Sequence, residues 1–232
     1  MHVLVIENYP GTPLGVVGEA LEEKGIGTQN VAAYEGEEVP THIGDAAGLI
    51  ILGGEQSAVA DETHPFLPDV CRLIQDAHAV SRPVLGICLG SQLIARALGG
   101  RNVLDRPVEF GWHDVKPTKA GQDDPVLCHL GDCAPMFHWH VDTVELPQNA
   151  VHLAASQMTH YQAYRVGQTT YAIQFHFEAS EAVVREWSKT LKDAIAKVQP
   201  NWPSMLEAEA QANGARADEA GRKIARAWVS LL

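Results

Sequence analysis

Apolar runs alternate with amphipathic segments over the first hundred residues. Short continuous apolar runs predict buried strands, and apolar residues spaced three and four apart predict helices. The strands are expected at 2–7, 28–33, 48–52 and 83–88, and the helices at 14–24, 66–80 and from the last strand to about 98. This alternation predicts an α/β fold with a mostly parallel central sheet, helices on both faces and functional residues at the carboxyl ends of strands.

After about residue 103 the pattern changes to short pieces rich in β-branched and aromatic residues, separated by turns. These pieces are expected at 108–115, 151–156, 162–166 and 170–175. They predict an antiparallel β extension of the sheet.

The last fifty residues have helical patterns. A helix is expected over 181–197, followed by one or two C-terminal helices in the alanine-rich stretch. The apolar residues that should pack these helices on the body are Ile224, Trp228 and Leu231. We therefore expect a catalytic domain at 1–198 and a helical extension at 199–232 packed on the same domain.

Candidate chemistry begins where the fourth apolar strand turns abruptly into a helix. Cys88 lies at this junction, between Gly86 and Gly90. Such an elbow lifts a nucleophile off the sheet, and small neighbours let the backbone bend and a substrate approach. The N–H groups at a helix start favour the reactive thiolate. Cys88 is the candidate nucleophile, and the alternative is a buried structural cysteine.

A base for this cysteine is expected in the segment 170–178, which has the composition of a strand. Side chains two apart on a strand share a face, so Gln174, His176 and Glu178 should point the same way. A carboxylate beside an imidazole fixes its tautomer and stabilises the imidazolium. Cys88, His176 and Glu178 therefore form a candidate triad, although such a His-x-Glu pair in isolation is usually a surface pair.

Four motifs in order carry a family resemblance. They are Leu52-Gly-Gly-Glu-Gln-Ser57, Gly86-Ile-Cys-Leu-Gly-Ser-Gln92, His140-Val-Asp-Thr-Val144 and Gln174-Phe-His-Phe-Glu178. With these motifs the chain resembles a class I, triad-type glutamine amidotransferase domain, and in particular stand-alone domains similar to the glutaminase half of GMP synthetase. The resemblance implies a flavodoxin-like fold, no cofactor, and cleavage of the glutamine amide through a γ-glutamyl thioester.

The resemblance also implies a role for individual residues. Cys88 would be the nucleophile, His176 the general base and acid, and Glu178 the residue that orients His176. The remaining roles are an oxyanion hole from the backbone N–H groups of Gly54 and Leu89, and substrate contacts from Gly53, Gln92, His140 and Asp142. A solvent-facing helix residue is the alternative for Gln92, and an ordinary turn residue is the alternative for Asp142.

Two positions depart from the family pattern. Phe177 stands where the family often has proline, and Glu55 follows the two glycines where proline is common. Neither change removes a catalytic group. Both favour the stand-alone branch over a GMP synthetase itself.

Charge and cysteine content limit the partners. With 17 basic and 29 acidic residues the formal charge is −12, which argues against nucleic acid or an anionic membrane as a partner. The sequence shows no signal peptide or membrane-spanning pattern, and four cysteines suit a reducing cytoplasm. The expected partners are a small glutamine-like substrate and an ammonia-accepting synthetase.

Cys128, Cys133, His138 and His140 are zinc-ligand types close together in sequence. Their spacing is looser than that of most zinc modules, and His140 already matches a family motif, so no metal site is predicted. The leading prediction is a thiol enzyme acting on glutamine, with a γ-glutamyl hydrolase, peptidase or transferase as the alternative. A different class of alternative is a catalytically idle regulatory or binding domain.

Overall fold

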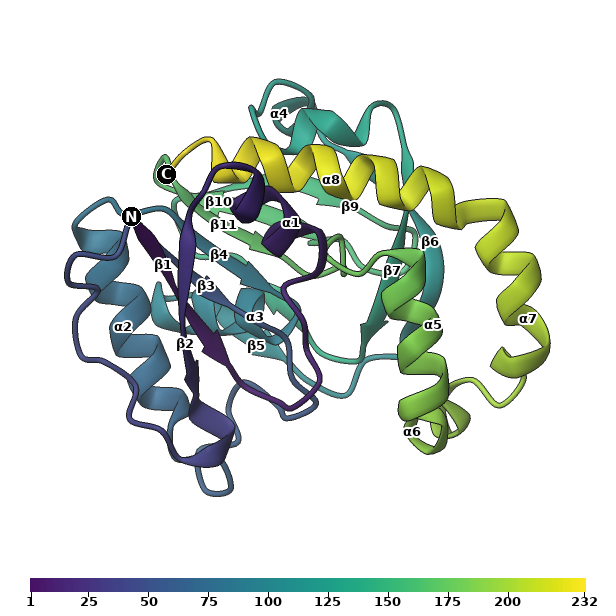
Figure 1. Cartoon of the computed structure of the whole chain (residues 1–232), viewed down its shortest axis with the longest axis horizontal. Helices are drawn as coiled ribbons and strands as arrows, with labels where there is room; N and C mark the ends of the chain where they lie inside the picture. The colour runs from purple at the N-terminus through teal and green to yellow at the C-terminus, as the bar shows by residue number, and fades with distance from the viewer.

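Eleven strands build the β structure of the computed structural model, which describes all 232 residues (Figure 1). The strands are β1 (His2–Glu7), β2 (Gly27–Ala32), β3 (Gly48–Ile51), β4 (Val84–Ile87), β5 (Arg101–Val103), β6 (Glu109–Pro117), β7 (Ala134–His140), β8 (Thr143–Glu145), β9 (Ala150–Ala155), β10 (Ala163–Val166) and β11 (Thr170–Ile173). Nine of them form one sheet in the order β2-β1-β3-β4-β11-β10-β9-β6-β7, and β5 pairs with β8.

The sheet has a parallel half and an antiparallel half. Strands β2, β1, β3, β4 and β11 run parallel to their neighbours in that order. From β11 onward, β10, β9, β6 and β7 each pair in the antiparallel sense. The predicted α/β class with an antiparallel extension is confirmed.

Helices connect these strands and cover the sheet. They are α1 (Gly15–Glu23), α2 (Leu67–Ala79), α3 (Leu89–Ala97), α4 (Lys119–Gln122), α5 (Glu181–Thr190), α6 (Lys192–Val198), α7 (Trp202–Glu209) and α8 (Ala215–Val229). Short 3₁₀ turns lie at Ala33–Glu35 and Leu127–Leu130, and a π-helical turn at Ala210–Gly214 links α7 to α8. None of the helices combines the length and apolar character needed to cross a membrane.

Alternation along β1 shows how the two faces are covered. Val3 and Val5 point into a core shared with α1 and α8, whereas Leu4 and Ile6 point into a core shared with α2 and α3. Figure 1 shows α8, in yellow, running along the sheet beside α1. Helices therefore lie on both faces, as the sequence pattern predicted.

A third apolar cluster joins the antiparallel edge to the C-terminal helices. Phe110, Trp112 and Phe137 of β6 and β7 pack against Trp187 of α5 and Trp202 of α7. The rings of Phe110 and Trp202 meet edge to face with their centroids 5.0 Å apart. This aromatic packing holds the helices α5, α6 and α7 against strands β6 and β7.

The C-terminal packing agrees with the sequence prediction. Ile224 and Trp228 of α8 are fully buried, and Leu231, just after this helix, packs on the same core. The single helix expected at 181–197 is wrong, because Leu191 leaves helical geometry with φ −111° and ψ 25° and separates α5 from α6.

Strands β5, β7 and β8 were not expected. The most important is β7, which is buried along almost its whole length and so lacks the alternation of polar and apolar residues that marks a half-exposed strand.

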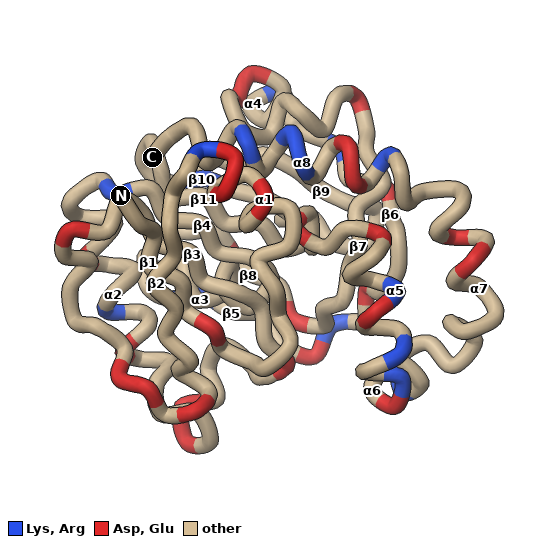
Figure 2. The backbone as a smooth tube through the Cα atoms, viewed as in Figure 1, with Lys and Arg blue, Asp and Glu red and all other residues tan.

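Lysines and arginines are scattered among acidic residues over the surface (Figure 2). Several arginines are neutralised locally: Arg226 pairs with Glu23, and Arg222 with Glu19, which ties α8 to α1. These exposed pairs contribute little to stability.

Candidate active site

The predicted elbow forms between β4 and α3. Cys88 has φ 52° and ψ −108°, a positive-φ conformation that a non-glycine residue adopts only when the surrounding structure enforces it. The strand before it pairs on both sides, with β3 and β11, and the helix after it is buried over nearly its whole length. The cysteine is therefore held by secondary structure on either side.

The two elbow glycines have a more specific role than bending the chain. Neither has a positive φ. A Cβ on Gly86 would lie 2.4 Å from the carbonyl oxygen of Gly90, and a Cβ on Gly90 would lie 2.1 Å from the carbonyl oxygen of Ile51. The expectation of a bend at these glycines is corrected, because they are needed for close packing of α3 on β3 and β4.

His176 and Glu178 lie beyond the strand on which they were expected. Strand β11 ends at Ile173, and the His176 N–H donates to the carbonyl of Phe137 in β7 at 2.8 Å. The imidazole and carboxylate still meet: His176 Nδ1 lies 2.6 Å from Glu178 Oε1, with both side chains buried. The prediction of one continuous strand was wrong because β7 takes over the hydrogen bonding of this segment.

The backbone of the His176–Glu178 segment is enclosed by two glycines from distant elements. A Cβ on Gly15, at the start of α1, would lie 1.9 Å from the carbonyl oxygen of Glu178. A Cβ on Gly221, in α8, would lie 2.3 Å from the carbonyl oxygen of Phe177. The C-terminal helix therefore contacts the backbone that carries the imidazole and carboxylate.

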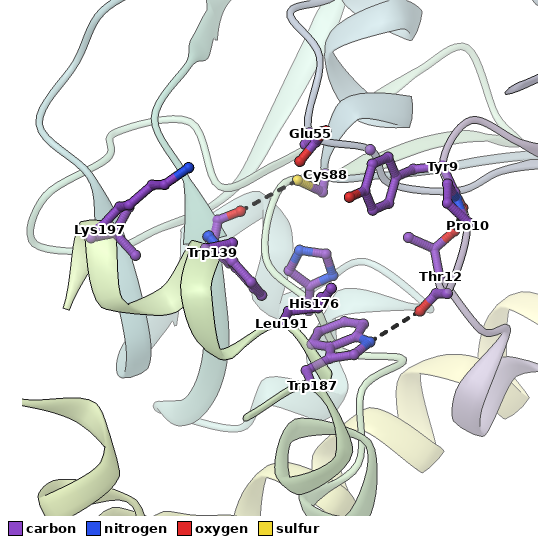
Figure 3. Close-up of a pocket in the computed structure, with 14 residues that line it drawn as sticks. Tyr9, Pro10, Thr12, Glu55, Cys88, Trp139, His176, Trp187, Leu191 and Lys197 are labelled. Atoms are coloured by element: carbon purple, nitrogen blue, oxygen red, sulfur yellow. Dashed lines mark hydrogen bonds between the residues drawn. The ribbon is translucent and has the colours of Figure 1, made fainter. Parts of the chain in front are cut away.

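Electrostatics favour a charged imidazole at His176. Burial would lower the pKa of His176, but the neighbouring carboxylate of Glu178 and the sulfur of Cys88 outweigh it and raise that pKa well above its ordinary value. Cys88 Sγ lies 3.7 Å from the carbonyl oxygen of Trp139. A dashed line marks this contact in Figure 3. Trp187 stacks edge-on against His176 with a centroid distance of 5.3 Å and shields that ring from solvent.

Two cavities open onto Cys88. The aromatic cavity has Tyr9, Trp139, His176, Trp187, Leu191 and Val198 in its walls (Figure 3). The polar cavity has Gln56, Ser57, Leu89, Gln92, His140 and Asp142 in its walls. Both include Gly54, Glu55 and Cys88, so a ligand that spans Cys88 can enter both.

Two residues that line the polar cavity, Gly54 and Leu89, have backbone N–H groups without an acceptor in the secondary structure. The N–H of Gly54 makes no hydrogen bond to the protein. Leu89 is the first residue of α3, so its N–H has no acceptor within the helix. A Cβ on Gly53 would contact both His176 and Cys88, at 3.4 and 3.6 Å, which shows how closely this loop approaches the pair.

Gln92 is buried, so its solvent-facing alternative is wrong. Its Nε2 donates to the carbonyl of Asp142 at 3.2 Å and to Gln174 Oε1 at 3.1 Å. Both amide hydrogens are thus used, and Oε1 is the atom left for a ligand. The Asp142 carboxylate accepts from the N–H of Asp105 at 3.1 Å, so part of its capacity fixes a turn.

Sequence reasoning missed a buried acidic residue, Glu109 of β6. Its carboxylate lies 3.2 Å from His140 Nε2 and accepts from Ser156 Oγ at 2.6 Å and Gln162 Nε2 at 2.9 Å. Burial alone would raise the pKa of Glu109, but the bond from His140, the nearby His138 and the Ser156 hydroxyl lower it to about 2. The available signal was an acidic residue placed between the apolar Val108 and Phe110.

This carboxylate anchors the wall of the polar cavity. His140 Nε2 faces Glu109, and His140 Nδ1 lies 3.1 Å from the carbonyl oxygen of Asp142. Polar contacts on both sides of the ring therefore fix its orientation. A chain of contacts thus runs from Glu109 through His140 to the Asp142 carbonyl and on to Gln92.

Glu109, His138 and His140 are also the residues that come close enough to share a metal ion, with ligand atoms within 4.8 Å of one another. The Glu109 oxygens already accept from Ser156 and Gln162, so a metal would share this carboxylate with both hydrogen bonds. Cys128 and Cys133 do not join this group. Burial lowers the pKa of His138 to about 3, which keeps this imidazole neutral.

Comparison with known proteins agrees with this architecture. Residues 17–186 match the family model of glutamine amidotransferase class-I. The chain is 31% identical to the glutamine amidotransferase-like protein YfeJ of Salmonella typhimurium over 85% of this chain and 84% of that protein. A glutamine amidotransferase structure from Thermotoga maritima superposes with a TM-score of 0.85 at 25% identity, covering 98% of each chain. The fold and the elbow therefore define a class I amidotransferase-type α/β protein.

The chain belongs to the class I glutamine amidotransferase family. It is also 28% identical to the GMP synthase of Thermosipho melanesiensis over 87% of its own length, but it spans only 38% of that protein. With a glutamine-hydrolysing GMP synthase subunit from Natronomonas pharaonis, the 28% identity covers 80% of this chain and 92% of that protein.

Proposed function

We propose that the protein cleaves the γ-amide of glutamine or of a related γ-glutamyl compound through a thioester at Cys88. The observation that supports this most directly is the meeting of an elbow cysteine and a buried imidazole–carboxylate pair at one cavity. An idle binding domain would have no need for the strained backbone at Cys88.

The reaction follows from these positions. His176 takes the Cys88 proton, and the sulfur attacks the γ-carbonyl carbon. The oxyanion that forms accepts hydrogen bonds from the N–H groups of Gly54 and Leu89, and each such donor is worth about 3–4 kcal/mol in related chemistry. His176 then gives its proton to the departing nitrogen, while Glu178 stabilises the imidazolium. Water hydrolyses the thioester and releases glutamate.

The polar cavity is the proposed site for the glutamyl group. Gln92 Oε1 and the Asp142 carboxylate are acceptors suited to its α-ammonium group, while Gly53 and His140 shape the walls. This assignment leaves Cys88 between the glutamyl site and the aromatic cavity.

The test is glutamate release from glutamine and γ-glutamyl amides by the purified chain, together with labelling by a glutamine-derived chloroketone. Intact mass should show one adduct that is absent from Cys88→Ala and retained in the control Cys128→Ala. Cys71 should not react, because burial raises the pKa of its thiol to about 11. Labelling that persists in Cys88→Ala, without glutamate release from any donor, would overturn the proposal.

A second candidate is a glutaminase that supplies ammonia to a separate synthetase in the cytoplasm. It is supported by the similarity to the GMP synthase subunit from Natronomonas pharaonis, which this chain matches over most of its length. The cytoplasmic assignment is supported by four free cysteines. This candidate requires glutamine to be the preferred donor and a partner to raise its turnover.

A further inference from the structure

The two cavities that meet at Cys88 differ in what they can do chemically. Each has a volume of about 280 Å³. His176 lines only the aromatic cavity, whereas Leu89, Gln92 and Asp142 line only the polar one. The two halves of a substrate bound across Cys88 therefore meet different surroundings.

The position of His176 decides which half of the substrate lies where. A general acid must lie within hydrogen-bond reach of the atom it protonates. The departing nitrogen must therefore lie on the side of Cys88 where His176 lies, which is the aromatic cavity. The acyl half then extends away from His176 into the polar cavity, toward Gln92.

The aromatic cavity is much larger than an ammonia molecule. In the same measure a molecule the size of water or ammonia needs about 10–15 Å³, so a cavity of about 280 Å³ has room for many of them. Its walls include the apolar surfaces of Trp187, Leu191, Ala194 and Val198, which gain nothing from ammonia. A Trp187 Nε1 bond of 3.1 Å to the Gly11 carbonyl holds two of these walls together. Preformed apolar pockets of this kind bind apolar groups.

A cation lies at the edge of the same cavity. Lys197 of α6 is exposed and forms no ion pair with any carboxylate of the chain. Figure 3 shows its side chain at the margin of the aromatic cavity. An apolar leaving group that also carries a carboxylate would match both the walls and this charge.

We propose that the aromatic cavity is a leaving-group site and that the preferred donors are γ-glutamyl dipeptides with an apolar or aromatic second residue. This inference rests on the proposed thioester chemistry. Cys88 sulfur forms a bond to the γ-carbon, the bond from that carbon to the second residue's nitrogen breaks, and His176 donates the proton to this nitrogen. Hydrolysis of the thioester completes the conversion of dipeptide and water to glutamate and a free amino acid.

The experiment compares kcat/KM for glutamate release from four donors: glutamine, γ-glutamyl-phenylalanine, γ-glutamyl-glutamate and γ-glutamyl-phenethylamide. The phenylalanine dipeptide should exceed glutamine by roughly 10-fold or more, the range expected when a pocket binds a large apolar group. γ-Glutamyl-phenethylamide lacks the carboxylate, so its kcat/KM should lie between those of glutamine and γ-glutamyl-phenylalanine.

Two variants localise the effect. Ala194→Phe fills the aromatic cavity and should lower kcat/KM for the phenylalanine dipeptide by about 10-fold, a larger fall than for glutamine, whose ammonia leaving group has no side chain to be displaced. Lys197→Gln should lower kcat/KM for the phenylalanine dipeptide several-fold and leave kcat/KM for γ-glutamyl-phenethylamide unchanged. The matched control is Lys192→Gln, because Lys192 is exposed on the same helix and lies outside the cavity.

The outcomes separate this inference from the proposed function. Cys88-dependent hydrolysis in which glutamine equals or exceeds every dipeptide would overturn the leaving-group site and leave the thioester chemistry standing. Hydrolysis of the dipeptide that is insensitive to Ala194→Phe would overturn it as well. Silence on all four donors, with no Cys88 adduct from the chloroketone, would overturn the proposed function itself.

Discussion

The two sides of the candidate active site are built in different ways. On the parallel side, β4, Cys88 and α3 are contiguous in sequence, and the close contacts of Gly86 and Gly90 shape the elbow. On the antiparallel side, the segment 176–178 is held by a strand and two helices far from it in sequence. The nucleophile therefore depends on local structure, whereas the imidazole and carboxylate depend on tertiary packing.

A second contrast concerns charge. The elbow is surrounded by apolar residues such as Ile87, Leu89 and Leu93. The antiparallel side buries Glu109, His138 and His140 next to the pair of His176 and Glu178. A buried polar network is stabilising only while its members keep their partners. We therefore expect single substitutions on this side to have graded effects that reveal the role of each group.

The largest effect is expected from His176→Ala. Turnover should fall by about 10⁵-fold or more, because the His176 imidazole is the proposed carrier of the proton in both steps. Glu178→Gln should be roughly 10- to 100-fold less severe, because the carboxylate orients and stabilises the imidazole without exchanging the proton itself. Steady-state glutamate release measures both. Equal and small losses would remove these two residues from the mechanism.

The next effect tests whether α8 holds the acid–base segment. Gly221→Ala places a Cβ against the Phe177 carbonyl oxygen, so the segment or the helix must shift. We expect a loss of about 1–3 kcal/mol in the free energy of unfolding and a fall in kcat of roughly 10- to 100-fold. Urea unfolding and steady-state kinetics measure the two effects.

Gly214→Ala is the matched control, because its added Cβ meets the far end of the flexible Glu181 side chain. It should leave kcat within about 2-fold of the parent chain. A Gly221→Ala protein that is less stable but turns over normally would show that α8 contributes stability alone.

The contrast between the two sides also explains how much was predictable. The elbow, its helix and the alternation of strands and helices in the parallel half follow from short-range periodicity, and Cys88 was found from that pattern. His176 and Glu178 were found as a pair, but on a strand that ends three residues earlier. Local composition cannot show that the Phe137 carbonyl of β7 captures the His176 N–H.

The role of Glu109 and the presence of the aromatic cavity could not be predicted from the sequence, for a related reason. The role of Glu109 depends on pairing between β6 and β7, in which Glu109 lies opposite His140, a residue distant in sequence. The cavity depends on the break at Leu191, which turns α6 back toward Trp139. Both features are set by long-range packing rather than by a local pattern.

A smaller effect is expected from Glu109→Gln, which keeps the shape and removes the charge that faces His140. The wall formed by His140 and Asp142 should loosen, so KM should rise by about 5- to 10-fold while kcat stays within about 2-fold. Glu145→Gln, at an exposed residue of β8, is the control and should change neither constant. A fall in kcat at constant KM would instead connect Glu109 to the chemical step.

The smallest effect is a change in the pH dependence of stability caused by His138. Its pKa is about 3 in the folded chain because it is fully buried, and near the ordinary value of 6.5 in the unfolded chain. Between pH 5 and 6.5 the unfolded chain therefore binds more protons at this position, and stability falls as pH falls. His176 acts in the opposite sense: its raised pKa contributes stability that is fully present below pH 6.5 and is lost as pH rises through the folded value.

Removing His138 should reduce the slope of the free energy of unfolding against pH, between pH 5 and 6.5, by up to about 1.4 kcal/mol per pH unit. Urea unfolding at four pH values from 5 to 6.5, on the parent, His138→Phe and His138→Gln, measures this slope. The two variants differ in packing but share the loss of titration, so they should differ in level and agree in slope; a parental slope in either would show that His138 is not the buried neutral group on this side of the site.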